Sequence, residues 1–296
     1  MKPLQGKVAL VAGATRGAGR GIAVSLGEAG ATVYCTGRST RGNPSPMNRP
    51  ETIEETAEMV TARGGEGIPV RTDHKIEDEV KALFERVKEE QNGQLDILVN
   101  DIWGSESLIE FGTPFWEMVI QKAIKVHETA VHTHMITSRY GVPLMIEQGK
   151  GLILEITDGV TYKYRGALPY SMAKIGTIHL AEAMAGDLVN KGYPDITAIG
   201  LTPGFLRSEE MLEKFGVTEE NWQEGAKVDL DFLMSETPYY VGRAAASLAA
   251  DQNVHRLNGK TMSSWALMHE YNFTDINGTQ PDWGKHFKEK YGEEAR

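Results

Sequence analysis

The sequence predicts an α/β fold in which helices cover both faces of a doubly wound parallel sheet. Short apolar runs rich in Val, Ile and Leu alternate with longer stretches of helical periodicity, and such repetition is typical of a parallel sheet with right-handed crossovers. The short runs do not alternate apolar with polar residues, as expected for strands covered on both faces. Of the 296 residues, 41% are apolar and 24% are charged, values that exclude disorder, collagen and coiled coil.

Six strands are expected from the apolar runs, because each run is bounded by Gly, Asp or Asn. They cover residues 7–12, 31–36, 67–71, 95–100, 151–157 and 195–201. Helices are expected between them, and the clearest carries Val80, Phe84 and Val87 on one stripe with charges on the opposite face. The helical stretches cover residues 19–29, 76–91, 113–148 and 169–191.

The organisation of the chain predicts a single domain over residues 1–296, because no internal repeat or low-complexity linker interrupts it. The polar, proline-rich stretch 39–50 is expected to form a surface loop after the second strand. Residues 205–236 are acidic and lack strand character, which predicts a helical lid over a substrate. Residues 272–296 form a polar C-terminal extension with scattered aromatic side chains, which we expect to pack against a neighbouring subunit.

The charge balance limits the partners of the chain. With 31 Lys and Arg against 41 Asp and Glu, the net charge is −10, which argues against nucleic acid or an anionic membrane as the main partner. No apolar run is long enough to span a membrane. Cys35 is the single cysteine, so no intrachain disulfide can form, and we expect a reducing, cytoplasmic location. Its place in the middle of a strand predicts a buried packing residue.

A glycine-rich loop follows the first strand and leads into a helix. Gly13, Gly17 and Gly19 are spaced as G-x-x-x-G-x-G, with Thr15 between the first two. Glycines are needed where the backbone turns sharply and where a pyrophosphate approaches main-chain N–H groups, and a helix N-terminus adds a positive dipole end. The loop therefore predicts a dinucleotide site.

The choice of cofactor is expected to be made at the end of the second strand. An acidic residue there would bind the ribose 2′-OH of NAD(H), but the chain has Arg38 and Ser39 instead. Arg38 can pair with a 2′-phosphate, and Arg16 in the glycine loop can add a second positive charge. The sequence therefore predicts NADP(H) in preference to NAD(H).

Further cofactor contacts are expected where the next two strands end. After the third strand, Asp73 is placed to hold the adenine amino group, with His74 beside it. Asn100 ends the fourth strand and can fix the loop over the adenosine ribose; the alternative is a simple strand-end cap.

A tyrosine and a lysine define the expected reacting end. Tyr170 and Lys174 lie four residues apart at the start of a predicted helix, so both side chains share one face. A phenol has a pKa of about 10, and a nearby ammonium lowers it. Tyr170 can then give a proton to a carbonyl oxygen or accept one from an alcohol, while Lys174 can also bind the nicotinamide ribose.

In combination and in this order, the motifs resemble those of the short-chain dehydrogenase/reductase family over about residues 5–265. The motifs are GATRGAG (13–19), TGR (36–38), Asp73, Asn100, YSMAK (170–174) and Thr202-Pro203-Gly204. The resemblance implies a Rossmann-type sheet of about seven parallel strands, hydride transfer with NAD(P)(H), and a homodimer or homotetramer. It also implies that Tyr170 is the acid/base, that Lys174 tunes it and binds the ribose, and that Pro203, Gly204 and Phe205 lie along the nicotinamide.

Two catalytic positions depart from the family pattern. The place of its catalytic serine holds Thr157 and Asp158, and two readings stay open: hydroxyl chemistry favours Thr157, and pattern matching favours Asp158. An ionised Asp158 beside Tyr170 would raise the phenol pKa and oppose Lys174. The family's Asn is replaced by His127, which either relays protons through water or is an ordinary helix residue.

Aromatic residues in the loops are expected to give an apolar substrate pocket. They are Trp103, Tyr162, Tyr164, Phe205 and Trp222. No metal is expected, because His132 and His134 point to different helix faces and no carboxylate or cysteine array completes a tetrahedron.

Together the motifs predict an NADP(H)-dependent oxidoreductase that acts on a small-molecule ketone, aldehyde or secondary alcohol. Two other classes stay open because the serine and asparagine positions are altered. One is a cofactor sensor that binds NADPH without turnover. The other is an epimerase or dehydratase of the same fold, which would consume no cofactor.

Overall fold

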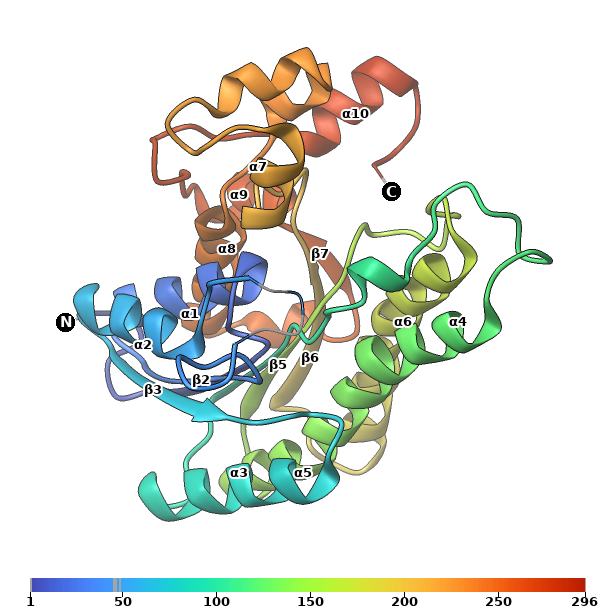
Figure 1. Cartoon of the computed structure of the whole chain (residues 1–296). Coiled ribbons are helices and arrows are strands. Elements are labelled where there is room, and N and C mark those ends of the chain that lie inside the picture. Colours follow the sequence, from blue (N-terminus) through green and yellow to red (C-terminus); the bar gives the residue numbers. More distant parts are fainter. Residues whose placement is uncertain (1, 45–46, 48, 296) are drawn as a thin grey trace.

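The computed structural model describes residues 2–44, 47 and 49–295 (Figure 1). In this part of the chain seven parallel strands form one sheet, in the order β3-β2-β1-β4-β5-β6-β7. The strands are β1 (Val8–Ala12), β2 (Thr32–Gly37), β3 (Glu66–Arg71), β4 (Ile97–Asn100), β5 (Gly151–Ile156), β6 (Ile196–Thr202) and β7 (Thr261–Ser263). The predicted doubly wound parallel sheet is confirmed.

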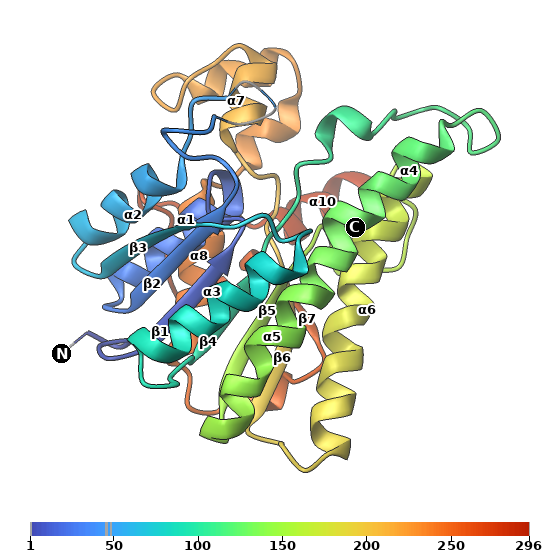
Figure 2. The same cartoon turned by 60° about the horizontal axis from the view of Figure 1, so that its bottom comes forward.

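Helices cover both faces of the sheet (Figures 1 and 2). Side chains of β1 alternate between two cores: Ala9 and Val11 pack with Ile22 of α1, whereas Val8 and Leu10 pack with Val80 of α3. Both faces of β1 are thus apolar, which explains why its sequence does not alternate. The helices are α1 (Gly17–Glu28), α2 (Ile53–Ala62), α3 (Glu77–Glu90), α4 (Ile120–His127), α5 (Thr133–Gln148), α6 (Leu168–Asn190), α7 (Glu209–Phe215), α8 (Pro238–Ala250), α9 (Ser264–Tyr271) and α10 (Trp283–Tyr291).

The strand order reverses at β1, which has β2 on one side and β4 on the other. In an open α/β sheet, a crevice for a ligand forms beyond the carboxyl ends of the two strands that flank such a switch point. The loops after β1 and β4 are therefore placed at a ligand crevice by topology alone.

The expected helix over residues 113–148 is wrong in its first part. Helical structure begins only at Ile120, and a π-helical turn, Glu128–His132, separates α4 from α5. The stretch before Ile120 contains Gly112, which has a φ of +82°, and Pro114, which cannot donate an intrahelical hydrogen bond. This segment forms a loop that carries exposed Phe115 and Trp116.

The acidic stretch after β6, residues 205–236, folds into helical turns, here called the lid, and its expected role as a cover for a substrate stays a prediction. It consists of α7 and two 3₁₀ turns, Trp222–Lys227 and Leu230–Met234, and it stands above the sheet in Figure 1. Phe205 lies edge-on to Phe215, Phe232 and Trp283, with ring centroids 5.3 to 6.1 Å apart. This aromatic cluster joins the lid to the C-terminal extension.

The C-terminal extension packs on the lid of its own chain through α10, and its expected contact with a neighbouring subunit stays a prediction. Asp231 of the lid accepts hydrogen bonds from His286, Lys290 and Tyr291 of the C-terminal helix segment. Burial alone would raise the pKa of Asp231, but these three bonds outweigh it and lower the pKa to about 2. Because the pKa is lowered on folding, the pairing stabilises the protein above the unfolded value near 3.9 and is lost as the pH falls toward about 2.

Asp231→Asn is expected to loosen α10 while leaving the sheet intact. The substitution removes the charge that three donors share, and charge-assisted hydrogen bonds stabilise by about 1.5–3 kcal/mol, so amides of α10 should exchange with deuterium about tenfold faster or more. Glu289→Gln is the control, because among the described residues this exposed α10 side chain pairs with Lys285 of its own helix and not with the lid. Equal exchange in Asp231→Asn and wild type would show that Asp231 does not hold the helix.

Among the described residues, no helix combines the length and the apolar character needed to cross a bilayer.

Candidate active site

A cavity of about 840 Å³ lies at the carboxyl end of the sheet, between the switch point and the lid. Most of the residues predicted to hold a cofactor line it: Gly13, Thr15, Arg16, Gly17, Arg38, Ser39, Asp73, His74, Tyr170, Lys174, Pro203, Gly204 and Phe205. Gly19 and Asn100 are not among the described residues that line it. The cavity therefore brings together the glycine loop and the tyrosine–lysine pair, which lie far apart in the sequence.

Two glycines of the loop, Gly13 and Gly19, leave no room for a side chain. Gly13 has a φ of +92°, and a Cβ there would lie 2.3 Å from the backbone oxygen of Asp101. A Cβ on Gly19 would lie 2.3 Å from the backbone oxygen of Gly13. Gly19 is thus required for close packing within the loop and not for direct contact with a ligand.

The N-terminus of α1 already binds a carboxylate. The Gly17 N–H donates to Glu209 Oε2 over 2.8 Å, and Arg20 Nη1 lies 3.8 Å from Glu209 Oε1. Glu209 belongs to α7 of the lid. Since exposed N–H groups and the helix dipole favour negative charge, this contact shows that the start of α1 attracts anions.

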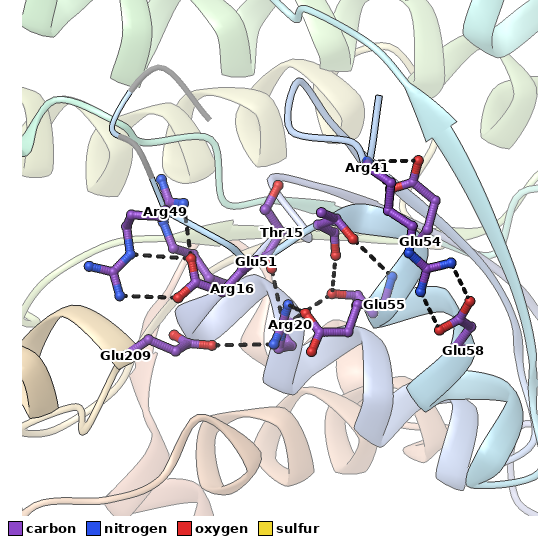
Figure 3. A network of polar contacts seen from close by, with 12 residues as sticks. Thr15, Arg16, Arg20, Arg41, Arg49, Glu51, Glu54, Glu55, Glu58 and Glu209 are labelled. Atoms are coloured by element: carbon purple, nitrogen blue, oxygen red, sulfur yellow. Dashed lines mark hydrogen bonds and ion pairs between the residues drawn. The ribbon is translucent and has the colours of Figure 1, made fainter. Parts of the chain in front are cut away.

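The two arginines proposed for a 2′-phosphate both have carboxylate neighbours. Arg38 Nη1 lies 3.9 Å from Asp73 Oδ2, and Arg16 Nη1 lies 3.6 Å from Glu51 Oε2. Glu51 is also bound by Arg49, as Figure 3 shows. Arg49 in turn donates to Glu213 of α7 over 2.6 Å, so a chain of charges connects the glycine loop with the lid.

Asn100 belongs to a buried hydrogen-bond network that holds the loop after β4. Its amide nitrogen donates to Ser138 Oγ (2.9 Å) and Glu155 Oε1 (2.6 Å), and Glu155 Oε2 lies 2.7 Å from His134 Nδ1. The other ring nitrogen of His134 is 3.1 Å from the Ile102 carbonyl, to which it must donate. Asn100 thus acts at a distance from the cavity, through a buried network that fixes the loop.

His74 touches the cavity wall with its ring but has no free nitrogen. Thr36 Oγ1 and Thr137 Oγ1 each lie 2.8 Å from one ring nitrogen. Burial, with a smaller contribution from His134, lowers the pKa of His74 to about 3, so the ring is neutral at physiological pH. It is not available for polar contact with a ligand in this arrangement.

The two candidates for the serine position have different surroundings. The Thr157 hydroxyl donates to the backbone oxygen of Lys174 over 2.8 Å and so is turned into the protein. The Tyr170 hydroxyl donates to Asp158 Oδ2, also over 2.8 Å, and the Asp158 side chain is 46% exposed. Asp158, not Thr157, stands beside the phenol.

Electrostatics around the phenol oppose its ionisation. Burial and then the negative charge and hydrogen bonding of Asp158 raise the pKa of Tyr170 well above 10. Burial lowers the pKa of Lys174, against the opposing effect of Asp158 and Asp101, and burial raises the pKa of Asp101 to about 7. The effect of Asp158 on Tyr170 has the sign expected from the sequence, and the phenol keeps its proton at neutral pH.

Aromatic rings surround Tyr170 and Lys174, and one of them, Phe111, was not predicted from the sequence. Trp103 and Phe111 both lie edge-on to Tyr170 with centroids 5.5 Å apart, and Lys174 Nζ lies 4.1 Å above the Trp103 ring. Tyr162, Tyr164 and Trp222 do not line the cavity within the described part of the chain. Trp222 instead stacks on buried Arg207 inside the lid, 4.0 Å from its guanidinium.

His127 does not share the described cavity wall with Tyr170 and Lys174. It ends α4, just before the π-helical turn, and is absent from the described cavity wall. Burial lowers its pKa. Across residues 2–44, 47 and 49–295, no cluster of His, Cys, Asp and Glu could hold a metal ion.

The carboxylates of the cavity wall that the sequence did not predict include Asp101, Glu106, Glu209, Glu210, Asp229 and Asp231. Glu106 lies in the loop after β4, and Glu209 and Glu210 lie on α7. In the sequence, Glu209 and Glu210 belong to the acidic stretch 205–236, which is typical of an exposed helix. No local pattern showed that the lid contacts the glycine loop.

Comparison with known proteins agrees with this geometry. A sequence model described as short chain dehydrogenase matches residues 7–219. The chain belongs to the short-chain dehydrogenase family. The chain is 35% identical over 280 residues to the mouse protein named dehydrogenase/reductase SDR family member 1, covering 93% of this chain and 85% of that protein. The human protein of the same name is 33% identical over the same shares.

Solved structures show the same short-chain dehydrogenase fold. A short chain dehydrogenase from Mycobacterium thermoresistibile superposes with a TM-score of 0.76 at 24% identity, covering 95% of this chain and 92% of that one. An actinorhodin polyketide ketoreductase superposes with a TM-score of 0.68 at 24% identity, covering 87% and 95%. The Rossmann-type sheet is thus the one that this family shares.

Proposed function

We propose that the protein is an NADP(H)-dependent oxidoreductase that transfers hydride between nicotinamide and a carbonyl or secondary alcohol. The observation that carries the proposal is that Tyr170, Lys174 and the glycine loop line one and the same cavity. Membership of the short-chain dehydrogenase family supports it. The ketoreductase among the structural neighbours was solved with NADPH.

The residues of the cavity fit a phosphorylated dinucleotide. Gly13 lets the loop turn tightly against the Asp101 backbone, and the Gly17 N–H already holds a carboxylate where a pyrophosphate would bind. Arg38 would bind the 2′-phosphate and Lys174 the nicotinamide ribose. When bound, the nicotinamide supplies or accepts the hydride.

The state of Tyr170 favours the reductive direction. Because its pKa lies well above 10, the phenol retains the proton that a carbonyl oxygen needs as it becomes an alcohol. Lys174 places a positive charge close to the oxygen on which negative charge develops. Trp103 and Phe111 shield the phenol from water. The chain therefore positions a proton donor, and the carbonyl oxygen takes its proton from Tyr170.

Cofactor binding and turnover test the proposal separately. A ligand that binds the native state alone raises the melting temperature, so NADPH should raise it more than NADH does, and Arg38→Leu should abolish the difference. A panel of ketones and aldehydes should then consume NADPH. Equal shifts with both cofactors would reject the NADP(H) preference, and no shift with either would reject the proposed function.

One observation favours a cofactor sensor as the second candidate. The proton of Tyr170 is directed at Asp158, which could hold it away from a substrate. A sensor would bind NADPH tightly and reduce no carbonyl compound in the panel, whereas an epimerase or dehydratase would convert substrate without net NADPH consumption. The homodimer or homotetramer and the cytoplasmic location stay predictions.

Glu209→Gln is expected to tighten NADPH binding by roughly threefold to fivefold. Glu209 is 26% exposed and lies where the pyrophosphate would meet α1, so removing its charge removes repulsion worth about 0.5–1 kcal/mol. Calorimetric dissociation constants give the comparison. Glu224→Gln is the control, because this exposed lid carboxylate pairs with Lys227 and is not among the described residues of the cavity wall, and it should bind NADPH as wild type does. Weaker binding by Glu209→Gln would mean that the carboxylate assists the cofactor.

A further inference from the structure

The reacting end of the cavity is built to accept a hydrogen bond from the substrate as well as to donate one. Tyr170 Oη donates to Asp158 Oδ2 over 2.8 Å. A serine at that position could donate to a carbonyl oxygen, but an ionised carboxylate can only accept. A bare ketone would therefore bring a second acceptor against Asp158 and be repelled.

The one guanidinium that we find near the Asp158 carboxylate, that of Arg165, makes its short hydrogen bonds elsewhere. Arg165 Nε lies 3.9 Å from Asp158 Oδ2, but the short bonds of this guanidinium go to backbone oxygens of Asp158, Thr161 and Lys163. With 46% of its side chain exposed, Asp158 presents its carboxylate to the cavity. It has capacity for a further donor because a carboxylate offers about four lone-pair sites.

A second carboxylate shares this end of the cavity without a hydrogen-bond partner. Glu106 Oε2 is buried and makes no hydrogen bond to the described residues, although Glu106 lines the cavity. Its charge helps to raise the pKa of Tyr170 and of Glu210 of the lid, and at Lys174 it opposes the larger lowering of the pKa by burial. A buried carboxylate oxygen without a donor is costly, so a ligand that brings a donor or a positive charge would relieve it.

We propose that Asp158 is a specificity-determining residue that selects carbonyl substrates with a protonated amine on the carbon next to the carbonyl. In such an α-amino ketone the nitrogen and the carbonyl oxygen are attached to two carbon atoms that are directly bonded to each other. This spacing suits a phenol and a carboxylate whose oxygens are 2.8 Å apart. Tyr170 then donates to the carbonyl oxygen and Asp158 accepts from the ammonium, with Glu106 adding negative potential from the loop after β4.

The reduction balances with groups already named. Hydride from NADPH forms the new carbon–hydrogen bond, the carbonyl π-bond breaks, and its oxygen takes the proton of Tyr170. The ammonium group keeps its protons and its bond to Asp158, so the product is a β-amino alcohol. This inference rests on the proposed function for the hydride step but not for the binding of the amine.

A matched pair of ketones tests the selection. Aminoacetone and butanone have the same number of heavy atoms and differ in one group, an ammonium or a methyl. At pH 6.5 with saturating NADPH, wild-type kcat/KM should favour aminoacetone by tenfold or more. Asp158→Asn and Asp158→Ser should each lower this ratio at least tenfold, and Asp158→Ser should reduce butanone at least as fast as wild type. Asp187→Asn, an equal loss of charge at the exposed far end of α6, should leave the ratio unchanged.

A binding measurement separates failure of this inference from failure of the proposed function. With NADP⁺ present, 1-amino-2-propanol should raise the melting temperature more than 2-butanol does, and Asp158→Asn should abolish the difference. Amine-dependent binding without any ketone turnover would reject the hydride chemistry and keep the specificity role. Turnover with an unchanged ratio in Asp158→Asn, or a wild-type preference for butanone, would overturn the inference itself.

Discussion

Tyr170→Phe is expected to lower kcat for a turned-over carbonyl substrate by about a hundredfold to ten-thousandfold, the usual range for loss of a general acid. The substitution removes one oxygen and with it the only proton that the phenol can give. NADPH affinity should change little, because the ring remains between Trp103 and Phe111. Single-turnover oxidation of NADPH, followed by absorbance, measures the effect without interference from product release.

Tyr162→Phe is the matched control for this variant. Tyr162 also loses only a hydroxyl, which bonds Glu182 at the surface, and it lies outside the described cavity wall, so turnover should equal that of wild type. A Tyr170→Phe enzyme with turnover near the wild-type value would mean that the proton comes from another group, and Asp158 would be the first to test.

The parts of this fold that the sequence predicted are those with strong local signals. The sheet was predictable because β1, β2, β4, β5 and β6 are continuous apolar runs, and the glycine loop because Gly13 and Gly17 punctuate it. β7 was not identified from the residues, since Thr261–Ser263 is three residues long and polar. The helices α2, α8, α9 and α10 were also missed. In α8 half of the buried residues are Ala or Gly, which weakens the apolar stripe.

Many residues of the candidate site were predictable one by one, but the contacts that its charged side chains make were not. Tyr170 and Lys174 share a helix face by spacing alone, and the structure brings both to the cavity. Whether Thr157 or Asp158 faces the phenol depends on the backbone conformation after β5, and no local pattern in the sequence predicts that conformation. The contact of Glu209 with Gly17 joins residues 192 positions apart, so it follows from the lid's tertiary position and not from any local pattern.

The second large effect concerns the contact between α1 and α8, which supports the glycine loop from behind. Gly21 of α1 lies against the start of α8, and a Cβ on Gly21 would be 2.0 Å from the backbone oxygen of Pro238. Gly242 of α8 meets α1 in the same manner, with a Cβ 2.3 Å from the Gly21 oxygen. The obstructing atoms are backbone, so they cannot move aside as a flexible side chain would.

Gly21→Ala is therefore expected to lower the free energy of unfolding by about 3 kcal/mol, near the upper end of overpacking costs. This sign is opposite to the usual one, since Ala in a helix interior is favoured over Gly by about 0.5–1 kcal/mol. Gly186→Ala provides the matched control: Gly186 lies within α6, and a Cβ there meets nothing within 4 Å. Urea unfolding should show a lower midpoint for Gly21→Ala and a higher one for Gly186→Ala. If both midpoints rose, helix propensity would outweigh packing at Gly21, and the close approach of α1 to α8 could not be what fixes the position of the glycine loop.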